Sequence, residues 1–104
     1  MLLIDSVEIT LLSYNIRQGY INIPAKKMYN FPDKKTEVEL HIGNSIYKVN
    51  FYVRESHHGF SRLSQFFKEH RELEKGDKVI IEVWESRSGK EYRLLSPKEQ
   101  KEVI

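Results

Sequence analysis

The 104-residue sequence predicts a small, mainly antiparallel β-barrel whose ends are closed by two short helices. Apolar and polar residues alternate along most of the chain, which is the period of strands that bury one face. The helical patterns are short and lie between the strands, and most connections have hairpin length. Because no repeat or linker divides the chain, we expect one domain over 1–95 and a charged tail at 96–104.

In the first half of the chain, the alternation predicts strands at 7–11, 20–23 and 38–42. The polar segment 13–19 lies between the first two strands and ends in glycine, so we expect it to be a turn. Residues 24–31 begin with proline, which is tolerated in the first turn of a helix, and they predict the first short helix.

In the second half, the clearest strand covers 47–54, because its odd-numbered residues are apolar or aromatic and its even-numbered residues are polar. A glycine–asparagine pair before it is typical of a tight hairpin. The apolar spacing of residues 61–70 predicts the second helix, with an aromatic pair facing inward. Strands at 78–84 and 91–95 complete the set, and we expect Trp84 to be buried in the first of them.

Composition excludes several classes of protein. The sequence has no cysteine, which removes disulfide scaffolds, cysteine nucleophiles and zinc fingers, and fits a reducing cytoplasm. No apolar run approaches the ~18 residues of a membrane span. The first residues also lack the basic leader of a signal peptide. We therefore expect a cytoplasmic domain with no membrane partner.

The net charge is only +2, but the basic residues are unevenly distributed. Residues 25–62 carry seven basic and four acidic side chains, whereas residues 63–104 carry nine of each. A local basic surface attracts phosphate even when the whole chain is nearly neutral. The distribution therefore makes a nucleic acid a candidate partner for the middle of the chain.

The sequence contains no recognisable motif for catalysis or metal binding. His57 and His58 are adjacent in an extended segment, so they point to opposite faces and do not chelate one ion together. The serines lack the setting of a nucleophile elbow, and segment 74–77 has one glycine and no phosphate-loop pattern. We therefore expect no catalytic residue, no metal and no cofactor.

Three tyrosines are not easily explained by core packing. Tyr14 and Tyr20 flank the polar segment that contains Arg17 and Gln18, and Tyr52 lies on the polar face of its strand. Arginine, glutamine and asparagine side chains can form paired hydrogen bonds with base edges in a major groove. A solvated loop is the alternative interpretation of each of these side chains.

Three segments follow an order that is typical of one family. A helix with an aromatic pair is followed by Leu73 and then by Gly76-Asp77 before an apolar strand. Upstream, segment 21–28 (Ile-Asn-Ile-Pro-Ala-Lys-Lys-Met) leads into the first predicted helix. This order resembles the B3 DNA-binding domain over about residues 7–95. Leu63-Ser64 stand where the plant form often has Gly-Trp, and the spacer before Gly76 is slightly longer, which favours a bacterial or phage-like branch.

The resemblance implies a seven-stranded open antiparallel pseudobarrel with two short helices, as in plant B3 transcription factors and in the recognition domains of some bacterial restriction endonucleases. Such domains clasp the major groove of DNA with two arms, which would be segments 13–20 and 50–62 here. The candidate DNA-binding residues of the first arm are Tyr14, Asn15, Arg17, Gln18 and Tyr20. Those of the second arm are Asn50, Tyr52, Arg54, Ser56, His57, His58 and Arg62.

The main hypothesis is therefore a sequence-recognising double-stranded DNA-binding domain that is not an enzyme. The residues expected to contact phosphates are Lys26, Lys27, Lys48 and Arg62. The residues expected to contact base edges are Arg17, Gln18, Asn50 and Arg54, with His57 or His58. No nuclease motif is present, so in a restriction or regulatory system any nuclease or effector would be a separate subunit or another part of a longer chain.

Two alternatives to this hypothesis stay open. One is a small β-barrel that serves as a protein-interaction module through the face that carries Tyr52. The other is a single-stranded nucleic-acid binder that stacks bases on Tyr14, Tyr20 and Tyr52.

Overall fold

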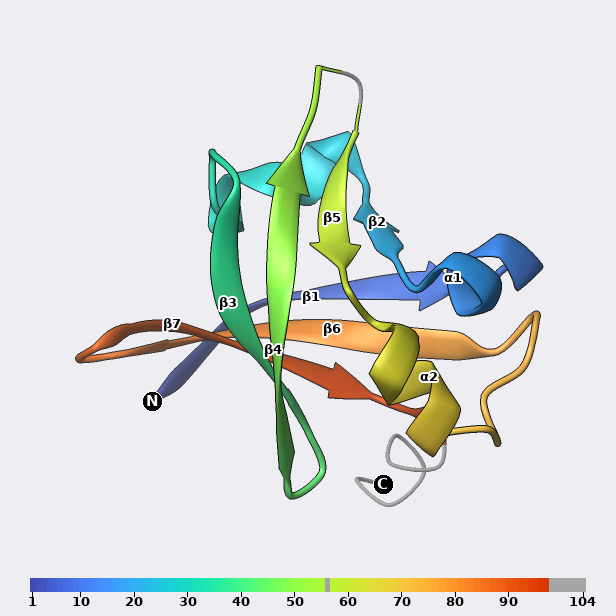
Figure 1. Ribbon diagram of the computed structural model, residues 1–104. Coiled ribbons are helices and arrows are strands. Elements are labelled where there is room, and N and C mark those ends of the chain that lie inside the picture. Colours follow the sequence, from blue (N-terminus) through green and yellow to red (C-terminus); the bar gives the residue numbers. More distant parts are fainter. Residues whose placement is uncertain (56, 98–104) are drawn as a thin grey trace.

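The computed structural model describes residues 1–55 and 57–97, and these residues form seven strands and three short helices (Figure 1). The strands are β1 (Leu2–Thr10), β2 (Ile21–Ile23), β3 (Thr36–Ile42), β4 (Ser45–Val53), β5 (His58–Ser61), β6 (Lys78–Ser86) and β7 (Gly89–Leu95). The helices are α1 (Ser13–Gln18), the 3-10 helix η1 (Ala25–Asn30) and α2 (Ser64–Glu69). Ser56 and most of the predicted tail, 98–104, lie outside the described residues.

All strands belong to one sheet, in the order β1-β6-β7-β3-β4-β5-β2. Antiparallel ladders join all neighbours except β3 and β7, which run parallel and pair at Leu40 with Tyr92 and at His41 with Arg93. The sheet curls into a barrel in which the edge strands β1 and β2 approach each other (Figure 1). The prediction of a mainly β, seven-stranded pseudobarrel is confirmed. The parallel pair makes the sheet mixed rather than wholly antiparallel, because packing, not a hairpin, brings β3 and β7 together.

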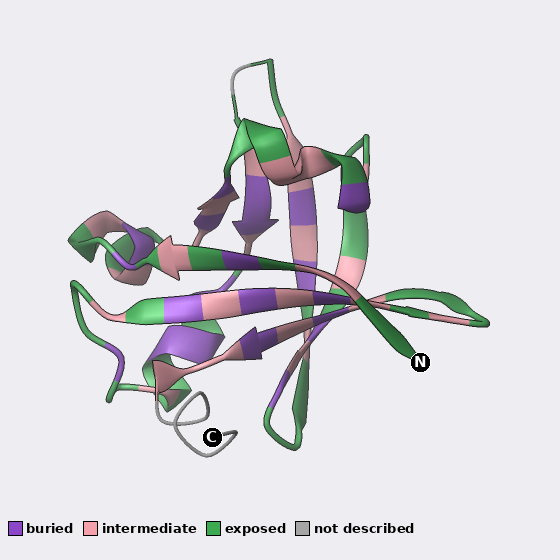
Figure 2. Cartoon of the chain, turned by 180° about the vertical axis from the view of Figure 1, so that it is seen from behind, coloured by how far each residue is buried: buried purple, intermediate pink, exposed green. Residues whose placement is uncertain are grey.

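The core lies inside the barrel and follows the alternation of the strands (Figure 2). Along β6, Val79, Ile81 and Val83 are completely buried, whereas the residues between them are only half-buried. The rings of Phe51 on β4 and Phe60 on β5 meet edge to face, with 5.2 Å between their centroids. Burial of this kind stabilises a fold by about 25 cal/mol for each Å² of apolar surface. One face of β4 and β5 therefore packs in the core, and the other face points outward.

Trp84, which the sequence predicts to be buried, is only half-buried on the outer face of β6. Because Val83 faces the core, the next residue of the strand must point the other way. The guanidinium carbon of Arg93 lies 5.2 Å from the centroid of the indole ring and covers part of it. Phe66 and Phe67 of α2 are buried, as their helical spacing predicts.

Segment 13–19, which the sequence predicts to be a turn, contains helix α1. The side chain of Asn15 is buried and holds both ends of this helix. Its Oδ1 accepts a hydrogen bond from the N–H of Leu12 at 2.8 Å, and its Nδ2 donates to the carbonyl of Tyr20 at 2.9 Å. Gly19, with a φ of 74°, ends the helix in the left-handed conformation that glycine adopts without strain. The helix depends on these caps and not on apolar periodicity, so the pattern did not show it.

Helix η1 is attached to the first strand through one carboxylate. The Nζ of Lys27 lies 3.1 Å from Oδ1 of Asp5, and the Nδ2 of the buried Asn30 donates to Oδ2 of the same residue at 3.1 Å. The helix predicted over 61–70 is confined to α2, because Arg62 has a φ of 64° and interrupts the backbone before it. In the described part of the chain, no helix has the length and apolar character to cross a membrane.

Candidate nucleic-acid interface

A depression of about 740 Å³ lies over β4, β5 and β2, and residues of helix α1 and of the segment between β4 and β5 also line it. Figure 1 shows these three strands side by side. We call the depression the arm groove, because both predicted arms contribute to it. The residues that line it are Gln18, Gly19, Tyr20, Asn22, Lys35, Asn50, Tyr52, Val53, Arg54, His57, Ser61 and Arg62.

The floor of the arm groove is the outer face of three neighbouring strands. Asn50 and Tyr52 alternate with the buried Val49 and Phe51 of β4, so they point away from the core. On β5, Gly59 lies directly between Tyr52 of β4 and Asn22 of β2 in the strand register. A Cβ atom on Gly59 would overlap the backbone carbonyl of Ile21, so only glycine allows β2 to pair this closely.

Helix α1 forms one rim of the arm groove and is fixed by contacts with the start of α2. The N–H of Leu63 donates to the carbonyl of Gly19 at 2.9 Å. The preceding residue, Arg62, holds the left-handed backbone conformation that costs an ordinary residue about 1–3 kcal/mol. Strain of this kind persists where the surrounding structure determines the backbone, and here it presents an exposed guanidinium at the rim.

The opposite rim is the tight loop between β4 and β5. The N–H of Arg54 donates to the carbonyl of His57 at 2.9 Å and closes the loop. Both side chains line the arm groove, and both residues are exposed. The loop therefore places one guanidinium and one imidazole at the end of β4, above Tyr52.

A continuous run of aromatic rings joins the two rims. The ring centroids of Tyr14 and Tyr20 lie 5.5 Å apart, those of Tyr20 and Tyr52 6.5 Å apart, and those of Tyr52 and His57 5.8 Å apart. The last two pairs meet edge to face, so part of one ring face in each pair is covered by its neighbour. The rings therefore form a packed floor rather than a row of fully open faces on which bases could stack.

Tyr52 is anchored in this floor by its hydroxyl, which donates to Oδ1 of Asn22 on β2. Burial, together with the neighbouring Tyr20 and Tyr14, raises the pKa of Tyr52 to about 12, although the positive charge of Arg54 acts to lower it. The phenol therefore stays protonated at neutral pH and can act as a hydrogen-bond donor.

The charge of the arm groove is one-sided. Lys35, Arg54 and Arg62 line it, and among the described lining residues there is no carboxylate. None of these three cations takes part in an ion pair with a described residue. Three unpaired cations around amide side chains and aromatic rings are suited to a polyanion that also presents hydrogen-bonding groups.

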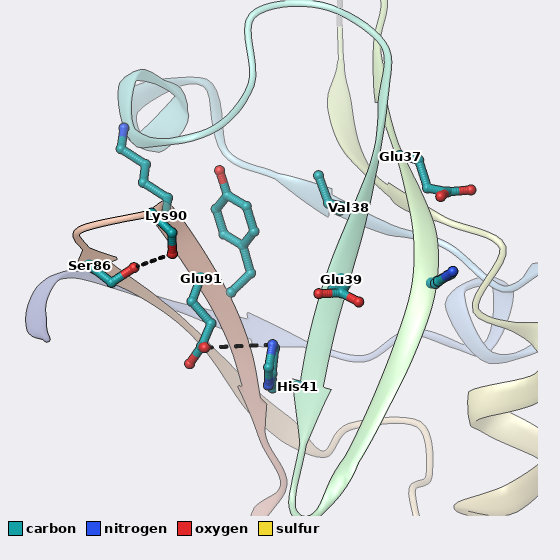
Figure 3. A pocket seen from close by; sticks show the side chains of 10 residues that line it. Glu37, Val38, Glu39, His41, Ser86, Lys90 and Glu91 are labelled. Carbon is teal, nitrogen blue, oxygen red and sulfur yellow. Dashed lines mark hydrogen bonds and ion pairs between the residues drawn. The ribbon is translucent and has the colours of Figure 1, made fainter.

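A second depression, of about 490 Å³, lies where β3 and β7 diverge and has a different character (Figure 3). Three carboxylates, those of Glu37, Glu39 and Glu91, line it together with Lys48 and Lys90. Its mixed charge gives it no preference for a polyanion. In the parts of the chain that the structure describes, no group of three metal-ligating side chains is close enough to hold an ion.

The structure brings seven of the predicted DNA-binding residues together in the arm groove: Gln18, Tyr20, Asn50, Tyr52, Arg54, His57 and Arg62. Tyr14 lies beside the groove through its contact with Tyr20. Ser56 lies outside the described residues.

The other predicted residues lie elsewhere. Asn15 is buried, and both polar groups of its side chain are used inside the arm, so it positions α1. His58 shares its strand face with the buried Phe60 and does not line the groove. Arg17 and Lys26 are exposed outside it. Lys27 is paired with Asp5, and Lys48 lines the second depression.

Five residues of the arm groove were not among the predicted DNA-binding residues, namely Gly19, Asn22, Lys35, Val53 and Ser61. Asn22 stands between two apolar residues of β2, a pattern that placed its side chain on the outer face but gave no reason to single it out. Lys35 follows another lysine in the segment before β3, and that pair of charges was the available signal.

Comparison with known structures places the fold. No protein-family model and no curated protein matches the sequence. The Arabidopsis FUS3–DNA complex superposes with a TM-score of 0.61 at 12% sequence identity, over 86% of this chain and 93% of that one. The N-terminal domain of Helicobacter pylori LlaJI.R1 gives a TM-score of 0.56, also at 12% identity, over 94% of this chain and 93% of that one. The chain is thus similar along nearly its whole length to both structures and has the B3-like pseudobarrel fold.

Proposed function

We propose that this chain is a domain that binds double-stranded DNA through the arm groove and recognises its sequence. The observation that carries the proposal is the groove itself, in which three cations and several amide side chains surround an aromatic floor without any carboxylate among the described lining residues. The likeness to the FUS3 structure, which is a complex with DNA, supports the proposal.

The groove suggests a division of roles. Lys35 and Arg62 line the groove, are exposed and would neutralise phosphates, which supplies affinity without sequence preference. Gln18, Asn50 and Arg54 carry the planar groups that can pair with base edges in a major groove. Arg17, His57 and His58 stay predicted base contacts, and Lys26, Lys27 and Lys48 stay predicted phosphate contacts outside the groove.

Single-stranded nucleic acid fits the groove less well than a duplex does. Strand-binding proteins offer open aromatic faces to successive bases, whereas Tyr20, Tyr52 and His57 partly cover one another edge to face. Competition between a duplex and its separated strands tests this directly. We expect the duplex to displace either strand from the domain, and preferential retention of a single strand would favour the alternative function.

A selection from random duplexes, followed by sequencing, tests the proposed function. We expect the parent domain to enrich a defined site and Arg54→Ala to lose preference at particular base positions, at a cost of about 1–3 kcal/mol in discrimination. Arg87, an exposed arginine in the turn between β6 and β7, provides the matched control, and Arg87→Ala should reproduce the parent profile. A parent domain that enriches no duplex at low salt contradicts the proposal and favours a protein-interaction module.

We further propose that this domain is not itself an enzyme and works with a nuclease or effector, on another polypeptide or on another part of a longer chain, in a restriction or regulatory system. The support is that none of the described side chains forms a metal-binding group and that no nuclease motif stands in the sequence. Incubation of the selected duplex with the domain and Mg²⁺ should leave the duplex intact, and cleavage by purified domain would contradict this part of the proposal.

A further inference from the structure

Asn22 on β2 forms a hydrogen bond with Tyr52 on β4, although strand β5 lies between them. Tyr52 on β4, Gly59 on β5 and Asn22 on β2 are aligned across the three strands. Gly59 has no side chain between Tyr52 and Asn22, and a Cβ there would overlap the backbone of Ile21 and Asn22. The hydroxyl of Tyr52 donates to Oδ1 of Asn22 and therefore takes one of the two lone pairs of the amide carbonyl.

The nitrogen end of the same amide is open to the groove. No hydrogen bond joins Nδ2 of Asn22 to a described residue. Among the described residues, every buried side-chain nitrogen or oxygen has a hydrogen-bond partner. Because Nδ2 of Asn22 has none, it is not buried and is accessible to solvent. Since Asn22 lines the arm groove, its side chain presents a free hydrogen-bond donor to the groove, whereas its carbonyl is already engaged by Tyr52.

We propose that Asn22 is a specificity-determining residue that donates a hydrogen bond to an acceptor on one base, and that Tyr52 is the positioning residue that fixes its amide. The inference rests on the proposed function of the arm groove. A free asparagine amide pairs with adenine through both of its ends, at N6 and N7. In an amide whose carbonyl oxygen already accepts a hydrogen bond, one of the two lone pairs is taken and the N–H donor is the free end, so the side chain favours guanine, with acceptors at O6 and N7, or thymine, with O4. It disfavours cytosine, which presents a donor in the major groove.

The protonation state of Tyr52 supports this assignment. Burial raises the pKa of Tyr52 to about 12, so its hydroxyl keeps the proton that the hydrogen bond to Asn22 requires. Tyr47, further back on the same strand, provides a matched comparison. Burial likewise raises the pKa of Tyr47 to about 12, but its hydroxyl donates to Glu69 on α2, at 2.6 Å, and not into the arm groove.

The test is the duplex selection applied to Asn22→Ala, to Tyr52→Phe and to the control Tyr47→Phe, each with a thermal melt to show that the variant is folded. We expect the parent to prefer guanine or thymine at one position and Asn22→Ala to lose that preference alone, by about five-fold in relative enrichment. Tyr52→Phe frees the carbonyl of Asn22, so adenine should rise at the same position. Tyr47→Phe should leave the profile unchanged, even if it lowers the melting temperature.

Each other outcome has a distinct meaning. Profiles of Asn22→Ala or Tyr52→Phe that match the parent at every position overturn the inference while the proposed function stands. A parent preference for cytosine at the position that responds to Asn22→Ala also overturns it, because the amide would then be presenting its carbonyl. The double variant provides a further check: adding Tyr52→Phe to Asn22→Ala should change nothing more at that position. A parent domain that enriches no duplex overturns the proposed function and this inference with it.

Discussion

A Cβ atom on Gly19 would lie 2.6 Å from Oγ of Ser64 and 2.8 Å from its backbone nitrogen, so α1 and α2 meet at a point where only glycine fits. The same glycine has a φ of 74° and ends α1. One residue thus both terminates the helix of the first arm and sets its distance from the second helix. The position of the arm over the groove depends on this contact.

Gly19→Ala is expected to destabilise the fold by more than about 2 kcal/mol, since the left-handed conformation alone costs about 1–2 kcal/mol and the backbone of Ser64 must also move. Gly43→Ala is the matched control. Gly43 has a φ of 58°, but a Cβ there meets nothing within 4 Å, so this variant should show the conformational cost alone. Urea denaturation of both variants measures the difference, and equal losses would show that the contact with Ser64 is not tight.

Lys35→Ala is expected to weaken all duplexes about equally and to reduce the slope of log K against log[salt] by about 0.9, since one phosphate contact is lost. Lys90→Ala, which removes an equal charge from the second depression, should leave the slope unchanged. Salt titrations of both variants test the location of the DNA. The same measurement on Lys26, Lys27 and Lys48 tests whether phosphates are also contacted outside the groove.

Arg62→Gly should separate binding from stability. Glycine adopts the φ of 64° found at Arg62 without strain, and this gain offsets the greater entropy of the unfolded chain. We therefore expect the free energy of unfolding to stay within about 1 kcal/mol of the parent, while affinity for every duplex falls. Arg62→Ala should lose the same affinity. A glycine variant that binds as tightly as the parent would remove Arg62 from the interface.

Asp5 should make the fold sensitive to acid. Burial by itself raises the pKa of Asp5, but hydrogen bonds from Asn30 and Lys27 outweigh it and hold the pKa below its ordinary value of 3.8. A carboxylate with a depressed pKa stabilises the fold above its unfolded-state pKa, and this contribution is lost as the pH falls through the folded-state value.

We therefore expect the parent to lose stability as the pH is lowered below about 4, and Asp5→Asn to be less stable at neutral pH but less sensitive to acid over that range. Glu8→Gln is the control, because Glu8 forms only an exposed ion pair with Lys78 at 3.7 Å. Unfolding measured between neutral pH and pH 3 distinguishes the two variants. An Asp5→Asn variant with the same acid sensitivity as the parent would contradict the role given to this carboxylate.

Local chemistry determined much of the fold. The alternation along β4 and β6 specified which side chains face the core, because successive residues of a strand point to opposite faces. The glycine and asparagine at 43–44 similarly specified the turn between β3 and β4. The arms could be located as the polar segments between strands, and seven of the residues predicted from them do line one groove.

Only the tertiary structure decided the rest, because those features depend on partners that are distant in the sequence. Helix α1 exists because Asn15 caps both of its ends and Gly19 fits against Ser64, and neither contact has a periodic signature. The alternation of β6 points Trp84 outward, but its ring is half-buried because Arg93, from β7, covers part of it.

The same reason applies to the site. Lys35 and Asn22 join the arm groove only when β3, β4, β5 and β2 are assembled side by side. The alternation in a sequence indicates which face of a strand a side chain occupies. The packing of the whole barrel determines which strands lie next to one another. The pairing of Tyr52 with Asn22 across Gly59 is therefore a property of the assembled sheet.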